Sequence, residues 1–224
     1  MIRSLYLSYL NEAVSEAEAL VLKQLVEQQL RRLVGTNQGI NEATVFHEER
    51  YLCTYLEHDD GVAVGSFDWS GELLSRLAAW PTLTGCRYAV ELTDVYHDGV
   101  PHDRTSWKEG RRIDDRVGAI ARLRPDWAAS YIFYHYQQQE EKPESFNKSY
   151  LIGYYDNLLF SYAELPAVVS PIKPEGKLRT SHSPEAGWHE LMEPHFHPWE
   201  DGELWKRVKH LCTVTREGWH RDVV

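Results

Sequence analysis

The chain has 224 residues, of which 42% are hydrophobic and 26% charged, and its formal net charge at pH 7 is −10. This is the composition of a soluble globular protein, and the excess negative charge argues against nucleic acid and anionic lipid surfaces as partners. No apolar run is long enough to cross a bilayer, and the N-terminal segment lacks a signal-peptide pattern, so we expect no membrane partner and a cytoplasmic location.

The first half of the chain predicts strands and helices in the order βαββαβ. Apolar residues at helical spacing, with Ser15 as the N-cap, indicate an amphipathic helix, and alternating apolar and polar residues indicate strands. The predicted elements are a strand at 2–10, a helix at 15–34, a hairpin at 41–57, a helix at 71–80 and a strand at 87–97.

The second half predicts the same order again. Its elements are a strand at 116–123, a helix at 126–139, a hairpin at 148–164, a short helix at 186–192 and a strand at 207–214. The hairpin segments "ERYLCTYLE" and "DNLLFSYAE" share an acidic first residue, a leucine, a tyrosine and a closing glutamate, with an offset of 107 residues from Glu57 to Glu164. Such self-similarity indicates an internal repeat.

The order βαββαβ is that of the ferredoxin-like split βαβ unit. We predict an α+β fold made of tandem ferredoxin-like βαββαβ units packed sheet to sheet as an intramolecular α+β barrel. The predicted domains are residues 1–98 and 116–224, joined by a polar, turn-rich linker at 99–115. Exposed edges of the sheets leave a homodimer open as well.

The run "RPDWAASYIFYHYQQQE" at residues 124–140 is unusually aromatic. Aromatic residues favour strands, but the proline-aspartate start, the two alanines and the position in the repeat favour a helix. On a helix, Tyr131 and His135 are four residues apart, so their side chains leave the same face, and Trp127 lies on the same stripe. We therefore expect this face to form the binding site.

The second half resembles the L-rhamnose mutarotases, small ferredoxin-like proteins that interconvert the anomers of a sugar. The resemblance runs from Arg116 to Val214 and rests on Pro125, the Tyr131 and His135 spacing, the strand "NLLFSYAE" and the segment "WHELM". The chain departs from the family after His135 and again between Glu164 and Trp188, where it is rich in proline and serine. The helix at 15–34 has neither tyrosine nor histidine, so we expect the first half to be a degenerate, structural copy.

The resemblance implies an aldose mutarotase, an isomerase that acts on a small deoxyhexose without a cofactor or metal. A histidine and a tyrosine could move the two protons that ring opening and closing require. Tryptophan rings could stack on the sugar. The implied catalytic residues are His135 and Tyr131, and the implied substrate-binding residues are Trp127, Trp188, Tyr150 and Tyr162.

Two other interpretations stay open at this point. The histidine could be a packing residue, and the chain a non-catalytic α+β barrel protein that binds a small ligand. A metal-dependent enzyme is the other alternative, because His195 and His197 are two residues apart and would share a face on a strand, with His182, His189 or Glu193 as further ligands. The three cysteines form no CxxC pair, which argues against a disulfide framework or a zinc knuckle.

Overall fold

The computed structural model describes residues 1–36, 39–61, 67–101, 107–108, 111–171, 175–178 and 187–216. Over these residues the chain has an α+β fold in which every strand pair is antiparallel. The predicted α+β class is therefore confirmed. The described helices include none that is long and apolar enough to span a membrane.

The chain divides into two compact units. Unit 1 consists of Met1–Leu92, Pro101–Arg112 and Lys209–Val224, and unit 2 consists of Thr93–Val100 and Ile113–Val208. The predicted linker at 99–115 lies partly outside the described residues. Each unit also contains a segment from the other half of the chain. Thr93–Val100 belongs to unit 2, and Lys209–Val224 belongs to unit 1.

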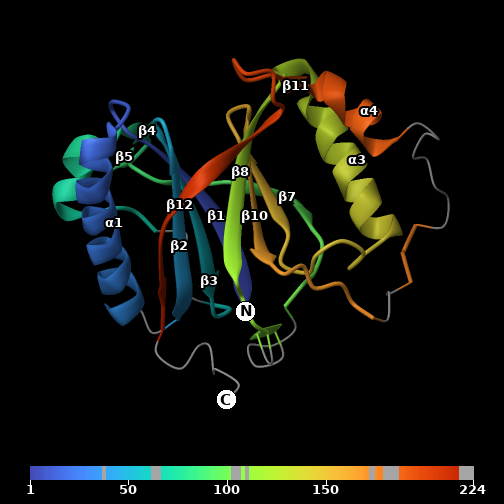
Figure 1. Ribbon diagram of the computed structural model, residues 1–224, viewed down its shortest axis with the longest axis horizontal. Helices are drawn as coiled ribbons and strands as arrows, with labels where there is room; N and C mark the ends of the chain where they lie inside the picture. The colour runs from blue at the N-terminus through green and yellow to red at the C-terminus, as the bar shows by residue number, and fades with distance from the viewer. Residues whose placement is uncertain are drawn as a thin grey trace. The chain divides into compact units, whose positions relative to one another are not determined.

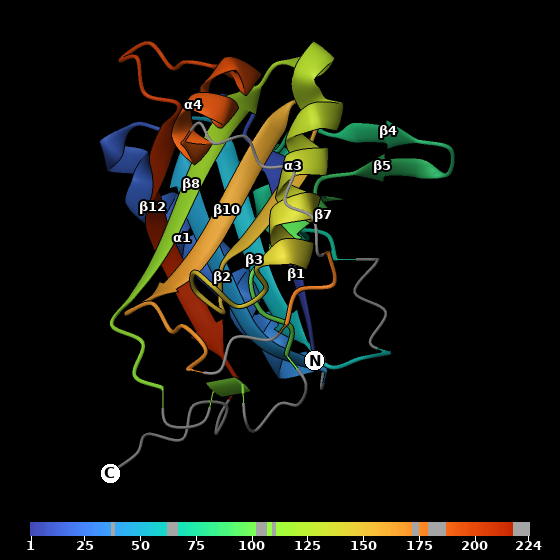
Figure 2. The ribbon, with the colours of Figure 1, turned by 90° about the vertical axis from the view of Figure 1, so that its right-hand side faces the viewer.

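Unit 1 is an antiparallel sheet with strand order β6-β1-β3-β2-β12, one long helix and a separate two-stranded hairpin. The hairpin, β4 with β5, projects from the sheet (Figure 2). The elements are β1 (Ile2–Tyr9), α1 (Glu16–Thr36), β2 (Ile40–Glu48), β3 (Tyr51–His58), the 3-10 helix η2 (Gly71–Arg76), β4 (Trp80–Thr82), β5 (Gly85–Arg87), β6 (Val90–Glu91) and the second part of β12 (Trp205–Thr215).

Two predicted elements of unit 1 are corrected by the structure. The helix expected at 71–80 is a 3-10 helix that ends at Arg76, and Trp80 begins a strand. Pro81 explains why Trp80 is not helical, since the residue before a proline is driven away from helical backbone angles. The strand expected at 87–97 is broken at Leu92 into β6 and β7 (Thr93–His97), which belong to different units.

Helix α1 lies along one face of the unit 1 sheet (Figure 1). Ser15 occupies the N-cap position as predicted, and the Glu18 side chain reaches back to it: the backbone N–H and the hydroxyl of Ser15 both donate to Glu18 Oε2, at 3.1 and 2.6 Å. The side chains buried against the sheet recur every four residues and are all aliphatic. They are Leu22, Val26, Leu30 and Val34.

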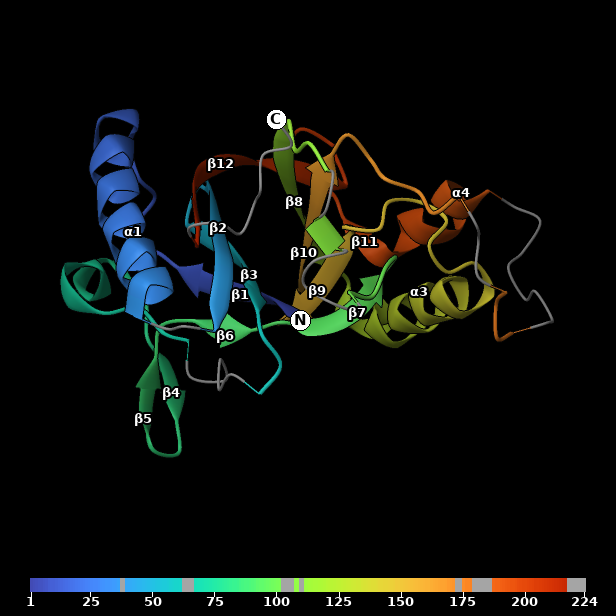
Figure 3. The same cartoon turned by 90° about the horizontal axis from the view of Figure 1, so that it is seen from below.

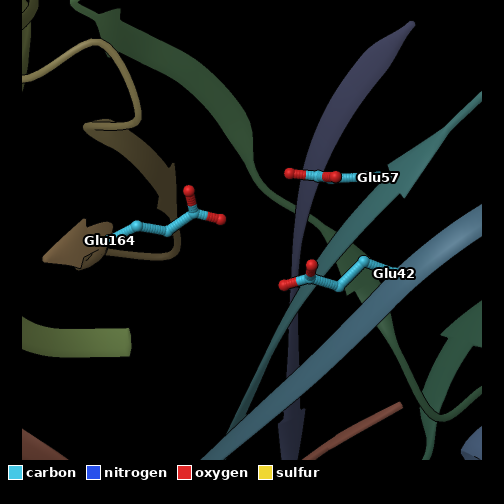
Figure 4. A group of neighbouring side chains, drawn as sticks. All are labelled: Glu42, Glu57 and Glu164. Carbon is cyan, nitrogen blue, oxygen red and sulfur yellow. The ribbon is translucent and has the colours of Figure 1, made fainter. Parts of the chain in front are cut away.

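A buried charged cluster lies within unit 1. Glu42 on β2 and Glu57 on β3 are directly opposite each other in the sheet register, and both are fully buried. Figure 4 shows these two side chains on their adjacent strands. Lys108 Nζ lies 2.7 Å from Glu57 Oε1 and 3.8 Å from Glu42 Oε2, and the Tyr55 hydroxyl donates to Glu57 at 2.6 Å. The ammonium offsets the repulsion that two opposed carboxylates would otherwise suffer.

Unit 2 is a sheet with strand order β12-β8-β10-β9-β7, with β11 paired to β8. The aromatic run forms helix α3, which confirms that prediction, and α3 and α4 lie on the same face of the sheet (Figure 3). The elements are β7, β8 (Asp115–Leu123), η3 (Pro125–Trp127), α3 (Ala128–Glu141), β9 (Leu151–Tyr155), β10 (Leu158–Leu165), α4 (Trp188–Met192), η4 (Glu193–His195), β11 (Phe196–His197) and the first part of β12.

The buried charges of unit 1 lead to a stability prediction. Replacing Lys108 with methionine removes the ammonium that contacts both carboxylates, so we expect the free energy of unfolding to fall by about 3–5 kcal/mol in urea denaturation. The matched control is Arg31→Met, which breaks the exposed pair of Arg31 with Glu27 and should cost less than about 1 kcal/mol. Equal losses in the two variants would contradict a stabilising role for Lys108.

Candidate functional site

Unit 2 contains a cavity of about 630 Å³, within the usual range for a small-molecule site. Side chains from α3, α4, β7, β9 and the segment from β11 to β12 form its wall. Most of the wall is apolar, with Ile152, Met192 and Leu204 between aromatic rings. The aromatic lining residues are Tyr96, Tyr131, Phe146, Tyr150, Trp188, Phe196 and Trp205.

Helix α3 brings the predicted pair Tyr131 and His135 together in this wall. The two side chains are one helical turn apart, and their ring centroids are 4.0 Å apart. Tyr131 is 1% exposed and His135 is 6% exposed. The rings of Tyr96 and Trp188 meet the His135 ring edge-on, at centroid distances of 5.8 and 5.0 Å. His135 is thus held on three sides by aromatic rings.

The protonation state of His135 follows from its surroundings. Burial lowers its pKa from the usual 6.5 to about 4, although the hydrogen bond to Tyr131 opposes this shift, so the ring is neutral at pH 7. Nδ1 lies 2.9 Å from the Tyr131 backbone carbonyl oxygen. A carbonyl can only accept, so Nδ1 carries the proton and Nε2 is an acceptor. Within the described residues, Nε2 has no hydrogen-bond partner.

The three tyrosines of the cavity wall differ in how their hydroxyl groups are satisfied. The Tyr96 hydroxyl donates to Asp98 at 3.2 Å, and the Tyr150 hydroxyl bonds Ser161. The Tyr131 hydroxyl is buried and has no partner in the part of the chain that the structure describes. Burial raises the pKa of Tyr150 to about 12 and that of Tyr131 well above its usual 10, so both groups are protonated at neutral pH.

The charged groups at the cavity are acidic. Glu193 and Glu203 line it and are exposed, which places them at its rim, beside the exposed His189. The described lining residues include no lysine or arginine. The buried titratable side chains of the described wall are neutral, so the described lining provides no positive charge to balance an anionic ligand.

The predicted substrate-binding residues fall into two groups. Trp188 and Tyr150 line the cavity together with the predicted catalytic pair. Trp127 and Tyr162 lie outside the described lining: Trp127 is 42% exposed and meets the His195 ring edge-on at 5.0 Å. Tyr162 is fully buried, and its hydroxyl donates to Glu164 at 3.0 Å. Alternation along β10 turns Tyr162 away from the helix-covered face.

The repeat in the sequence reappears as a repeated hydrogen bond. In unit 1 the Tyr55 hydroxyl donates to Glu57, and in unit 2 the Tyr162 hydroxyl donates to Glu164, which Figure 4 also labels. Each tyrosine lies two residues before its glutamate on the second strand of a hairpin. The shared tyrosine and glutamate therefore have an equivalent structural role in the two units.

Sequence reasoning missed Tyr96 and Phe146 as cavity residues. The predicted boundary at residue 98 assigned Tyr96 to the first domain, whereas β7 pairs with β9 in unit 2. Asp98 then fixes the loop that carries Phe146, because its carboxylate accepts the backbone N–H groups of Ser145, Phe146 and Asn147. An acidic residue directly after the "DVYH" strand was the signal that could have pointed to this anchor.

The proposed histidine metal site is not formed by the described residues. His195 is buried, and its ring nitrogens bond the Ser130 hydroxyl at 2.9 Å and the Met192 carbonyl at 3.2 Å. His197 is exposed on β11, so the expectation that the two side chains share a face is wrong. His195 ends a 3-10 helix, which breaks the alternation on which that expectation depended. His182 lies outside the described residues.

Comparisons with known proteins give no family. No family model matches the chain, and no curated protein matches it. Among solved structures it is similar to a "putative monooxygenase" from Fusobacterium nucleatum, with 10% identity over 96% of this chain and 95% of that chain and a TM-score of 0.46. A second structure of the same description, from Lactobacillus acidophilus, has 9% identity over 96% and 97% and a TM-score of 0.45.

A third similar structure, an anthrone oxidase-like protein, has 10% identity over 99% of this chain and 96% of that chain, with a TM-score of 0.43. At these scores the similarities identify no reaction for this chain. The names they carry, however, are those of monooxygenases and an oxidase, so the interpretation of the chain as a sugar mutarotase is contradicted.

The geometry gives a physical reason for this correction. Proton transfer near neutral pH is most effective from groups whose pKa lies near the working pH. The pKa of His135 is lowered to about 4 and that of Tyr131 is raised well above 10, both chiefly by burial. The pair that was expected to act as acid and base is therefore poorly matched to mutarotation.

The depressed pKa of His135 predicts a loss of stability in acid. The unfolded chain takes up its proton near pH 6.5 and the folded chain only near pH 4, so the contribution is complete above pH 6.5 and is lost as the pH falls toward 4. At pH 4.5 the loss should be about 2–3 kcal/mol, measured by urea denaturation against pH 7.5. His135→Gln should remove that part of the pH dependence.

An NMR titration of the His135 ring is the independent check on this prediction. A midpoint near 6.5, or a His135→Gln variant with the same acid destabilisation as the native chain, would show that the ring is not held neutral by burial.

Proposed function

We propose that the cavity of unit 2 binds a flat, uncharged small molecule of aromatic character. The observation that carries the proposal is the aromatic wall around a buried, neutral histidine. A volume of about 630 Å³ accommodates a molecule of two or three fused or linked rings. Aromatic side chains contact flat ligands through offset or edge-on stacking, worth about 0.5–1.5 kcal/mol for each pair beyond the area buried.

The charges at the site favour this ligand class over anions. Glu193 and Glu203 would repel a carboxylate or phosphate at the rim, and His135 provides no cation inside. Taking an anion into an apolar wall without a counter-charge is strongly unfavourable. Neutral ligands avoid that cost, so selectivity against anions follows from the same features that favour aromatic rings.

Three predictions from the sequence remain proposals. We retain the assignment of the units as tandem ferredoxin-like copies packed sheet to sheet. It is supported within each unit by strand order, because the first strand, β1 or β8, lies between the third and the fourth. A small sugar as the ligand and a homodimer as the assembly stay predictions as well.

Calorimetric titration with flavone, a neutral three-ring compound, tests the proposal. We expect saturable binding of one molecule, and binding of flavone-6-carboxylate at least tenfold weaker because its charge is not balanced in the wall. Trp188→Ala should weaken flavone binding by about 3–10-fold through the loss of one ring contact. Trp80→Ala in unit 1, whose ring packs on Tyr9, is the matched control and should bind flavone normally.

Absence of flavone binding by the native chain would overturn the proposal. Adding L-rhamnose to the same titration tests the sugar prediction, and binding of the sugar in place of flavone would reverse the assignment of the ligand class.

A further inference from the structure

We propose that the ligand of the unit 2 cavity carries two polar groups on its flat frame: a hydroxyl that donates to His135 Nε2 and a carbonyl oxygen that accepts from the Tyr131 hydroxyl. This inference rests on the proposed function, since it describes the ligand of the same cavity. It narrows the class from aromatic compounds in general to hydroxylated aromatic ketones.

The first half of the inference comes from the tautomer of His135. Its Nδ1–H is used by the Tyr131 carbonyl, which leaves Nε2 as a lone acceptor on a ring that lines the cavity. Within the described residues no donor reaches it. Nε2 is not among the fully buried atoms without a partner, so it is open to the cavity, and a ligand that covers it gains by presenting an O–H group.

The second half comes from the Tyr131 hydroxyl. Tyr131 lines the cavity and is 1% exposed, and its hydroxyl has no hydrogen-bond partner in the described part of the chain. The two other cavity tyrosines, Tyr96 and Tyr150, both have partners. Tyr131 is thus the exception among the three tyrosines of the wall, and such unpaired buried groups often mark functional sites.

A phenolic O–H can donate or accept, but a phenol is a better donor, and a carbonyl oxygen is a good neutral acceptor on a flat ligand. The Tyr131 hydroxyl is covered by neighbouring side chains, so the carbonyl reaches it as those side chains adjust around the ligand. Side-chain adjustments of this kind are common on binding. Because the rings of Tyr131 and His135 are stacked on adjacent turns of α3, one edge of the ligand can contact both side chains.

The first test is a matched pair of ligands. 6-Hydroxyflavone and 6-methoxyflavone have the same ring frame and carbonyl, and only the first can donate to His135 Nε2. We expect the native chain to bind the hydroxyl compound about 3–10-fold more tightly. His135→Phe should bind both compounds equally, because the acceptor is gone while an aromatic ring remains.

The second test separates binding from stability. Tyr131→Phe removes a hydroxyl that lacks a partner, so its melting temperature should be unchanged or rise by about 2–4 °C, while flavone binding weakens by about 3–10-fold. Tyr162→Phe is the control, because its hydroxyl bonds Glu164 outside the cavity lining. It should lower the melting temperature and leave flavone binding unchanged.

The outcomes are distinct. Flavone binding without preference for the hydroxyl compound, or with unchanged affinity in Tyr131→Phe, would overturn this inference and leave the proposed function standing. No binding of any flavone would overturn both. A lower melting temperature for Tyr131→Phe with unchanged binding would show that its hydroxyl has a structural partner rather than a ligand.

Discussion

Burying a polar group in the aromatic wall of unit 2 is costly unless the group has a partner, and this constraint shapes the site. The Nδ1–H of His135 meets it locally, because it bonds the carbonyl one turn earlier in α3. Tyr96 meets it through Asp98, which also holds the loop that carries Phe146. Satisfying these groups fixes both the ring orientations and the shape of the cavity. The same low polarity that makes an unpaired group costly also keeps the histidine neutral.

Each unit has a helix on one face of its sheet, but the two helices bury different kinds of side chain. The buried face of α1 presents only aliphatic side chains, such as Leu22 and Leu30, which fill the space above their sheet. The equivalent face of α3 presents Tyr131 and His135, whose flat rings leave a cavity between them and α4. Unit 1 keeps its charges on β2 and β3 instead, where Lys108 holds Glu42 and Glu57. The two helices therefore differ in the side chains that they bury: aliphatic in α1, and aromatic rings that line the large cavity in α3.

Much of this arrangement could be predicted from the sequence, for reasons that lie in short segments. The helix at α3 and the facing of Tyr131 and His135 follow from the proline-aspartate start and from helical spacing. The β9–β10 hairpin follows from the residues at its turn, where Asp156 and Asn157 adopt positive φ values of 46° and 62° that asparagine and aspartate tolerate. What could not be predicted depends on pairing between distant segments. Tyr96 joins the cavity only because β7 pairs with β9, and periodicity within β7 carries no information about its neighbour.

Strand β12 has a consequence for how the chain reaches this structure. Its first residues, Trp205 to Val208, pair with β8 in unit 2, and the residues from Lys209 onward pair with β2 in unit 1. Thr215 closes the sheet opposite Glu42, a contact between segments far apart in the sequence. During synthesis, unit 1 therefore cannot complete its sheet until nearly all of unit 2 has left the ribosome. The N-terminal unit, although made first, is finished last, and until then the edge of β2 must be kept from pairing with other chains.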